Sequence, residues 1–352
     1  MTSASIPGEW DEVLQRVSRA KGHVLVVGPV DCGKTTFTTL LASSQASTAG
    51  SAVVIDADLG QTEIGPPACV TVGSFSSDMS ALSQASVLHS AFVGAVSPSG
   101  VTSMLIGALC QCMAATSDVR LIVDTGGYAM RQDAWEQIMS IAAVVQPSDI
   151  VLLQRSHEVA PLERMLRLLP GVTLHVPPLA AGLQIKSREY RSQRRRIKFS
   201  AALTPSSLLE FDFWSTPVLP TWLGTGKTLP THLYSYVKQV LAPSVKVYHA
   251  EQWGDQLGLL VNVEPTPSAP ALHAIRSATK AVDVHCIPAP SLKNRLVGLV
   301  AQSKSLLALG IVEKLDCRRG IVGIRTPIRT PLSVAAIQLG RLNMRADGTE
   351  IK

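Results

Sequence analysis

The sequence is poor in cysteine and in charged residues, and it has no long apolar run. Its six cysteines show no C-x-x-C spacing, so neither a zinc site nor a disulfide framework is indicated, and a reducing cytoplasm is the expected setting. Residues 101–115 are the most hydrophobic stretch, but Ser103, Gly107 and Gln111 interrupt them. No run of about 18 apolar residues is therefore available to cross a bilayer, and we expect no membrane association. Acidic residues precede any apolar run at the N-terminus, which argues against a signal peptide.

The composition is otherwise that of an ordinary globular protein. The chain has 352 residues, of which 46% are hydrophobic and 16% are charged. A chain of this length can bury a full core and commonly forms two domains, which we place at residues 1–200 and 201–352. The formal net charge of +6 is modest, but the basic residues are not spread evenly.

A glycine-rich segment, residues 28–36, matches the phosphate-loop pattern G-x-x-x-x-G-K-[ST] at every specified position. Residues 23–27 before it read as a buried strand, and residues 36–42 after it as the start of a helix. In such a loop the backbone N–H groups wrap a polyphosphate at the helix N-terminus. Lys34 would reach the β- and γ-phosphates, and Thr35 would supply a hydroxyl to Mg²⁺. The alternative is a glycine turn that carries a surface lysine.

Continuous apolar segments indicate a parallel sheet in the first half of the chain. Strands of this kind are buried on both faces, and here they alternate with helical patterns, which predicts a doubly wound α/β domain of the P-loop NTPase type. Ser97 and Pro98 suit the cap and first position of one of the helices. The expected strands are residues 51–58, 88–96, 119–124 and 149–153, and the expected helices include residues 10–20 and 101–113.

The pattern changes beyond about residue 200. Prolines punctuate the next segment, and short strands follow at residues 245–250, 257–263, 296–301 and 320–325, so we expect a second, smaller β-rich domain. Residues 224–228 imitate a phosphate loop. They lack its first glycine, and Pro230 would stop a following helix, so we reject that interpretation.

Acidic and amide side chains follow two of the predicted strands. Asp56, Asp58 and Gln61 come after the strand at 51–58, and Asp124 ends the strand at 119–124. Open α/β sheets bind ligands at the carboxyl ends of their strands. These groups suit metal-water coordination, activation of a nucleophile and orientation of a γ-phosphate. The alternative is that Asp58 and Asp124 only stabilise glycine turns.

A strongly basic stretch spans residues 186–198. If it is helical, Arg188, Arg191 and Arg195 share one face. Such a run can simply be solvated, but a same-sign cluster repels itself unless an anion meets it, and arginine binds phosphate bidentately. We therefore expect contact with a polyphosphate or a nucleic acid. Cys32, at a helix N-terminus, is a candidate for a lowered thiol pKa, although a passive role is the simpler interpretation.

Several of these segments occur in the order of a known family's motifs. They are residues 28–36, the D-x-D-x-G-Q segment 56–61, the F-x-G-x-x-S-P-x-G segment 92–100, Thr-Gly-Gly-Tyr at 125–128 and R-x-x-x-R at 191–195. The set resembles the polynucleotide 5′-hydroxyl kinases of RNA processing, which include the kinase of pre-mRNA 3′-end cleavage and the pre-ribosomal RNA kinase. In that family residues 125–128 correspond to the "clasp" and 191–195 to the "lid". Residues 307–327 are similar to its closing β-segment, so the resemblance runs from about residue 10 to 330.

The resemblance implies transfer of the γ-phosphate of ATP, with Mg²⁺, to the 5′-hydroxyl end of single-stranded or duplex RNA or DNA. Asp58 would accept the hydroxyl proton, and Asp56 and Thr35 would hold Mg²⁺ directly or through water. Lys34, Arg191 and Arg195 would neutralise charge in the transition state. The implied nucleotide-binding residues are Gly28, Asp31, Cys32, Gly33, Lys34, Thr35, Thr36 and Gln61, and those for the substrate end are Thr125, Gly126, Gly127, Tyr128 and Arg188.

The chain departs from the family at three points. Tyr128 stands where the family commonly has tryptophan, although any aromatic face can stack on a base. Ala68 replaces the glycine of a usual Pro-Pro-Gly. The stretch before the phosphate loop is too short for the separate N-terminal domain of eukaryotic members, so we expect a compact prokaryotic-type member. The sequence indicates no particular protein partner.

Three other functions remain open from the sequence. One is a nucleotide-dependent switch or ATPase without kinase activity, and another is a small-molecule P-loop kinase. The third is an RNA-binding adaptor that uses residues 186–198 alone, which would leave Lys34, Asp58 and Gln61 without a shared purpose. The sequence has no N-K-x-D motif of a GTPase and no L-S-G-G-Q signature of an ABC-type ATPase.

Overall fold

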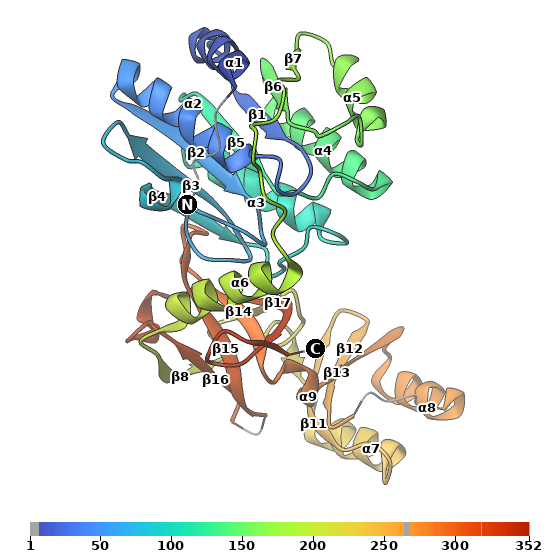
Figure 1. The fold of residues 1–352 in the computed structure, drawn as a ribbon. Helices are drawn as coiled ribbons and strands as arrows, with labels where there is room; N and C mark the ends of the chain where they lie inside the picture. The colour runs from blue at the N-terminus through green and yellow to red at the C-terminus, as the bar shows by residue number, and fades with distance from the viewer. Residues whose placement is uncertain (1–6, 264–267, 318, 352) are drawn as a thin grey trace. The chain divides into compact units, whose positions relative to one another are not determined.

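The computed structural model describes residues 7–263, 268–317 and 319–351. The chain divides into two compact units, Met1–Lys198 and Phe199–Lys352, and Figure 1 shows the elements of each. The division falls within α6 (Arg188–Leu203), the helix that carries the basic stretch. No helix among the described residues is long and apolar enough to cross a membrane.

A seven-stranded sheet forms the centre of the first unit, in the order β4-β3-β2-β5-β1-β6-β7. Neighbouring strands from β2 to β7 in this order are parallel, so their carboxyl ends lie at one edge. This confirms the predicted fold class. The five parallel strands are β1 (Val24–Val27), β2 (Ser51–Ala57), β5 (Leu121–Thr125), β6 (Asp149–Leu152) and β7 (Thr173–His175).

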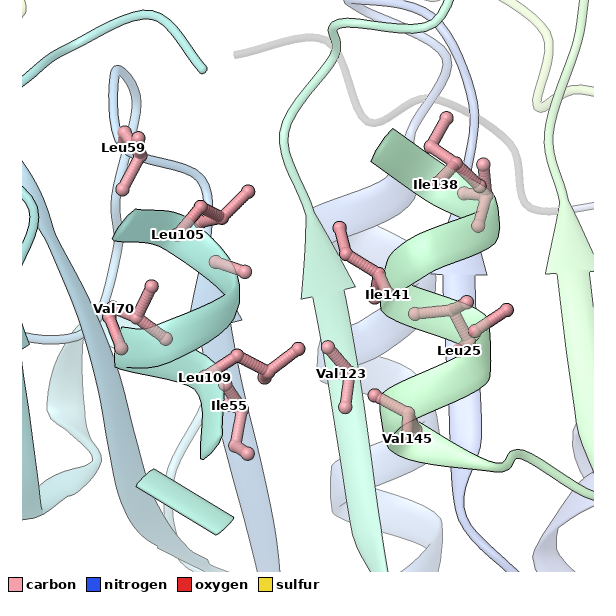
Figure 2. Packing of buried hydrophobic residues seen from close by; sticks show 14 of the residues in the cluster. Leu25, Ile55, Leu59, Val70, Leu105, Leu109, Val123, Ile138, Ile141 and Val145 are labelled. Carbon is pink, nitrogen blue, oxygen red and sulfur yellow. The ribbon is translucent and has the colours of Figure 1, made fainter. Parts of the chain in front are cut away.

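Helices cover both faces of this sheet, which explains why its strands are continuously apolar. Val24 and Val26 of β1 pack with α1 and α2, whereas Leu25 and Val27 pack with α3, α4 and α5. Figure 2 shows the second of these cores, where side chains of α3 and α4 lie against the strands. The helices are α1 (Gly8–Arg19), α2 (Lys34–Ala49), α3 (Thr102–Ala114), α4 (Gln132–Val145) and α5 (Ala160–Arg167).

One edge of the sheet differs from the alternating strand and helix pattern. The strand expected at residues 88–96 is β4 (Ser86–Phe92), and it runs antiparallel to β3 (Cys69–Ser76), which the sequence did not predict. The expected helix cap at Ser97 and Pro98 is wrong, because α3 begins at Thr102. Gly100 adopts a left-handed φ of 71°, which breaks any helical path between Pro98 and Thr102.

The second unit is rich in β-structure, as expected. One sheet has the order β10-β11-β12-β13, and the other has the order β18-β17-β14-β15-β16-β8, with β9 beside β17. The strands of the first sheet are β10 (Lys227–Thr228), β11 (Val247–Trp253), β12 (Gln256–Val261) and β13 (Asp283–Pro288). Those of the second are β8 (Ser207–Asp212), β9 (Val218–Leu219), β14 (Arg295–Val300), β15 (Leu306–Asp316), β16 (Ile321–Thr326), β17 (Ala336–Met344) and β18 (Glu350–Ile351).

Helices α7 (Thr231–Leu241) and α8 (Ala269–Thr279) cover one face of the four-stranded sheet, and α9 (Ala289–Leu292) follows β13. The segment that imitates a phosphate loop, residues 224–228, lies in this unit. The N–H groups of Gly224 and Gly226 donate to the buried carboxylate of Glu251, at 3.0 and 2.9 Å. A protein carboxylate already occupies these donors, which supports the rejection of this segment as a phosphate site. The expectation that Pro230 stops a following helix is wrong, because α7 begins directly after it, at Thr231.

Candidate active site

The phosphate loop joins β1 to α2 in a backbone path that requires glycine. Gly28 has a φ of 153°, and a Cβ there would lie 2.1 Å from the carbonyl oxygen of Leu153. Gly33 has a φ of 85° and precedes the first residue of α2. Lys34 is 7% exposed, and its Nζ donates to the carbonyl of Pro29 at 2.8 Å. Lys34 is thus held against the phosphate loop, and we expect both to bind the same polyphosphate.

Arg155 supports the same loop from outside, and the sequence analysis missed it. It follows β6, and its guanidinium donates to the carbonyls of Val30 and Asp31 at 3.3 and 2.7 Å. The same group lies 3.4 Å from the sulfur of Cys32. The available signal was its position just after a buried strand, at the edge where Asp58 and Asp124 also lie.

Cys32 contributes its backbone to the loop, and its side chain is fully buried in the core beneath α1 and α2. Burial raises the pKa of the thiol, although the positive charges of Arg155 and Lys34 oppose this rise. Burial therefore outweighs the helix-terminus effect considered from the sequence, and the passive interpretation fits.

Thr35 and Asp124 form a direct pair between α2 and β5. The Thr35 hydroxyl donates to Oδ2 of Asp124 at 2.9 Å. Oδ1 of Asp124 is buried and has no hydrogen-bond partner among the described residues. Burial and the neighbouring charge of Asp56 raise the pKa of Asp124 well above its usual value, while Lys34 and the Thr35 hydrogen bond lower it. An unpartnered carboxylate oxygen beside a hydroxyl is an arrangement that fits a divalent cation.

Asp56 lies at the end of β2, but its oxygens face its own loop. Oδ1 accepts the N–H of Asp58 at 3.0 Å, and Oδ2 accepts the Thr62 hydroxyl at 3.1 Å and the N–H of Ile64 at 3.0 Å. Burial and the charge of Asp58 raise the pKa of Asp56 to about 6, and the backbone hydrogen bonds oppose the rise. Through these contacts Asp56 stabilises the conformation of the D-x-D-x-G-Q loop.

Asp58 and Gln61 come next on that loop. Oδ1 of Asp58 accepts the N–H groups of Gly60 and Gln61, each at 2.9 Å. Gln61 donates through Nε2 to the carbonyl of Arg191 at 3.3 Å, and its Oε1 is buried without a partner among the described residues. Asp58 therefore does stabilise a glycine turn, and in addition it lines the cavity described below.

The clasp residues, 125–128, follow β5 and divide into separate environments. The Thr125 hydroxyl donates to the carbonyl of Val26 at 2.8 Å and is buried in the sheet. Gly127 approaches the phosphate loop so closely that a Cβ there would lie 2.8 Å from the Cα of Val30. The Tyr128 hydroxyl donates to the carboxylate of Asp133, a hydrogen bond that lowers the pKa of Asp133. Of these residues, Gly127 lines the cavity.

The lid is the first part of α6, and its arginines reach two acidic partners. Arg191 donates to Oδ2 of Asp31 at 3.1 Å, which ties α6 to the phosphate loop. Arg194 pairs with Glu63 at 2.5 Å, a contact that the sequence analysis did not foresee. Arg188 is exposed at the start of the helix, and Arg195 is partly buried, one turn beyond Arg191.

A cavity of about 490 Å³ brings these elements together. The phosphate loop, the D-x-D-x-G-Q loop, the clasp and the lid all contribute to its wall. The lining residues include residues 30–36, Asp58, Gln61, Glu63, Gly127, Lys186, Arg191 and Arg194. No cluster of three or more His, Cys, Asp or Glu side chains that could hold a metal occurs in the described ranges. A metal here would therefore need oxygens from water or phosphate as well, as Mg²⁺ commonly does.

A doubly wound sheet with a phosphate loop at the carboxyl edge of its strands, and a cavity walled by that loop, defines a P-loop nucleotide-binding protein. Residues 28–201 match the family described as mRNA cleavage and polyadenylation factor CLP1 P-loop. This match confirms the family resemblance that the motifs indicated.

Relatives and a solved structure agree with this assignment. A polyribonucleotide 5′-hydroxyl-kinase of Pyrococcus abyssi is 27% identical over 336 residues, which cover 95% of this chain and 90% of the relative. One of Methanocaldococcus jannaschii is 24% identical over 360 residues, with coverage of 99% and 95%. The Clp1p chain of a Clp1p–Pcf11p complex shares the fold, with a TM-score of 0.57 at 13% identity over 95% of this chain and 78% of that one.

Proposed function

We propose that the protein is an ATP-dependent kinase that phosphorylates the 5′-hydroxyl end of a polyribonucleotide. The observation that carries the proposal is the single cavity in which the phosphate loop, Asp58 and the lid arginine Arg191 meet. The cavity thus holds, beside the loop, a carboxylate that can accept a proton and an arginine that can neutralise charge on a transferring phosphoryl group. The archaeal relatives align with nearly the whole chain, and each is named polyribonucleotide 5′-hydroxyl-kinase.

The loop binds the polyphosphate of ATP through its backbone N–H groups, and Arg155 keeps the loop carbonyls in place. Lys34 leaves the carbonyl of Pro29 to contact the β- and γ-phosphates. Thr35 and Asp124 hold Mg²⁺, and Asp56 supports this site by fixing the adjacent loop. When bound, Mg²⁺ neutralises charge on the β- and γ-phosphate oxygens.

Asp58 acts as the base for the incoming hydroxyl. The 5′-oxygen forms a bond to the γ-phosphorus as the bond from that phosphorus to the β,γ-bridging oxygen breaks, and ADP leaves. The hydroxyl proton passes to Asp58, whose carboxyl is fixed by the N–H groups of Gly60 and Gln61. Gln61, with an unpartnered amide oxygen in the same wall, orients the reacting groups.

The lid neutralises the charge that develops during transfer. Arg191 already reaches the loop through Asp31, and Arg194 lines the cavity beside it. Arg195, one helical turn from Arg191, serves the same purpose when the nucleotide is bound. The clasp, with Gly127 against the loop and Tyr128 beyond it, receives the terminal nucleotide, and exposed Arg188 meets its phosphates.

The direct test is transfer of labelled γ-phosphate from ATP, with Mg²⁺, to oligonucleotides that end in a 5′-hydroxyl. Single-stranded and duplex RNA and DNA are compared, and the same oligonucleotides carrying a 5′-phosphate serve as blocked controls. We expect label on the 5′ end of RNA, none on the blocked controls, and none with Lys34→Ala.

Two outcomes would contradict the proposal. Clean ATP binding without transfer to any nucleic acid would leave the nucleotide switch. Transfer to nucleosides or metabolites, but not to oligonucleotides, would indicate a small-molecule kinase.

A further inference from the structure

Three aromatic rings form a row on the four-stranded sheet of the second unit. The rings of Trp222 and Trp253 are 6.0 Å apart between centroids, with an angle of 19° between their planes. Trp253 and His285 follow at 5.8 Å and 25°. The three planes are therefore nearly parallel, although the residues come from a loop, from β11 and from β13. The sequence analysis did not single out any of them.

The register of the sheet explains how the row is built. Trp253 of β11 lies opposite Gln256 of β12, and His285 of β13 lies beside Gly258. The ring of Trp222 covers Gly258, where a Cβ would meet ring carbons at 2.4 to 2.6 Å. The intervening residues of β12 point to the other face, into the core with α7 and α8. The row thus occupies the face that these helices do not cover.

Two hollows adjoin the row, and Thr225 and Trp253 line both of them. The first, of about 640 Å³, is lined by all three rings. The second, of about 530 Å³, contains Lys227. None of the described residues that line the two hollows is acidic, and Lys227 is the charged residue among them. Asp283, two residues before His285 on β13 and opposite Gln256, lies 3.7 Å from Arg276, so the row has both Lys227 and an ion-paired carboxylate near it.

The ring nitrogens of the row have two different environments. The indole N–H of Trp222 is buried and has no acceptor among the described residues. The imidazole Nε2 of His285 is 2.7 Å from Oε1 of Gln256, which holds the ring in its stacked orientation. Planar heterocycles with polar edges match such a surface, because they stack on aromatic rings and accept hydrogen bonds in their own plane.

We propose that this row binds unpaired bases of single-stranded RNA. The inference deepens the proposed function, on which it rests, by giving the second unit a role in holding the polyribonucleotide. A base stacks on the exposed ring of His285, which Trp253 supports from its other side, and Lys227 meets the backbone phosphate. Because every base has a π-face, this site grips RNA with little sequence preference.

The test measures binding, not transfer. The probe is a 5′-phosphorylated oligo(A) of about ten nucleotides with a 3′ fluorophore, which cannot act as a kinase substrate, and the readout is fluorescence anisotropy. We expect Trp253→Ala to raise the Kd at least about fivefold, as the loss of one stacked base predicts, and Trp253→Phe to stay within about twofold of wild type. His285→Ala removes an exposed ring at little risk to folding, and it should also raise the Kd.

The matched control is Tyr236→Ala, which removes an exposed ring on α7 in the same unit and should leave the Kd unchanged. Lys34→Ala should abolish transfer but retain this binding, so the two proposals fail independently. Unchanged Kd values for folded Trp253→Ala and His285→Ala would overturn the inference. So would tryptophan quenching by a proline-rich peptide with none by RNA, because the row would then be a peptide groove.

Discussion

Gly126 and Gly127 are neighbours in the clasp, yet their surroundings differ sharply. A Cβ at Gly127 would lie 2.4 Å from Cγ1 of Val30 and 2.9 Å from its backbone nitrogen. A Cβ at Gly126 would meet nothing nearer than Oδ1 of Asp58, at 3.5 Å, which is an ordinary contact. Gly127 thus allows the clasp to approach the phosphate loop closely, whereas Gly126 has room for a side-chain Cβ.

We expect Gly127→Ala to lower kcat/KM for phosphoryl transfer about 100-fold, because the clasp or the loop must shift by a substantial part of an ångström. Gly126→Ala is the matched control and should stay within about threefold of wild type. Steady-state kinetics with a 5′-hydroxyl RNA measures both. Equal effects of the two changes would show that the close approach of Gly127 has no role in catalysis.

Helix α1 is attached to the sheet by one arginine that precedes β5. Arg120 donates through Nε to the carbonyl of Gly22 at 2.9 Å and through Nη1 to that of Ser18 at 3.1 Å. Its Nη2 donates to the carbonyl of Val17, also at the end of α1. The guanidinium thus binds carbonyls in the last turn of α1 and in the segment that follows it.

We expect Arg120→Ala to lower the free energy of unfolding of the first unit by about 2–3 kcal/mol, because partly buried carbonyls lose a charged donor. Hydrogen exchange by mass spectrometry should show the loss first in peptides from α1. Arg131→Ala, which removes an arginine whose side chain is 74% exposed, should change stability by less than about 0.5 kcal/mol. Unchanged protection of α1 in Arg120→Ala would rule out this attachment.

The helices and strands differ in how far their sequence reveals them. The strands β1, β2, β5 and β6 are predictable, because burial on both faces makes them continuously apolar. β3 is not, since Gly73 and polar Ser74 and Ser76 interrupt its apolar pattern. The helices α7 and α8 lie among segments whose prolines and short apolar runs suggest strands. Their helical state depends on packing against a sheet that no local pattern reveals.

At the scale of the whole molecule, the candidate site is predictable where a sequence motif directly follows a parallel strand. Gly28, Lys34 and Asp58 follow parallel strands, so the carboxyl edge of the sheet had to bring them together. Glu63 and Arg155 were missed, because their partners are far away in sequence. The aromatic row could not be predicted either, because strand register, and not the order of residues in the sequence, brings Trp222, Trp253 and His285 together.

The roles of the acidic residues needed the structure as well. The family resemblance gives Asp56 a role at Mg²⁺ and Asp58 the hydroxyl proton. The oxygens of Asp56 accept hydrogen bonds from its own loop, whereas Asp58 lines the cavity. One oxygen of Asp124, beside Thr35, has no partner in the part of the chain that the structure describes. We therefore propose that Thr35 and Asp124 would hold the metal and that Asp58 accepts the proton.

The central claim is that one cavity combines nucleotide binding with a base for the 5′-hydroxyl. Single-turnover transfer by Asp58→Asn, with ATP affinity measured on the same preparation, tests it most directly. We predict an ATP Kd within about threefold of wild type and a transfer rate lowered by about 10²- to 10⁴-fold, as the loss of a general base requires. Transfer at the wild-type rate by this variant would contradict the account.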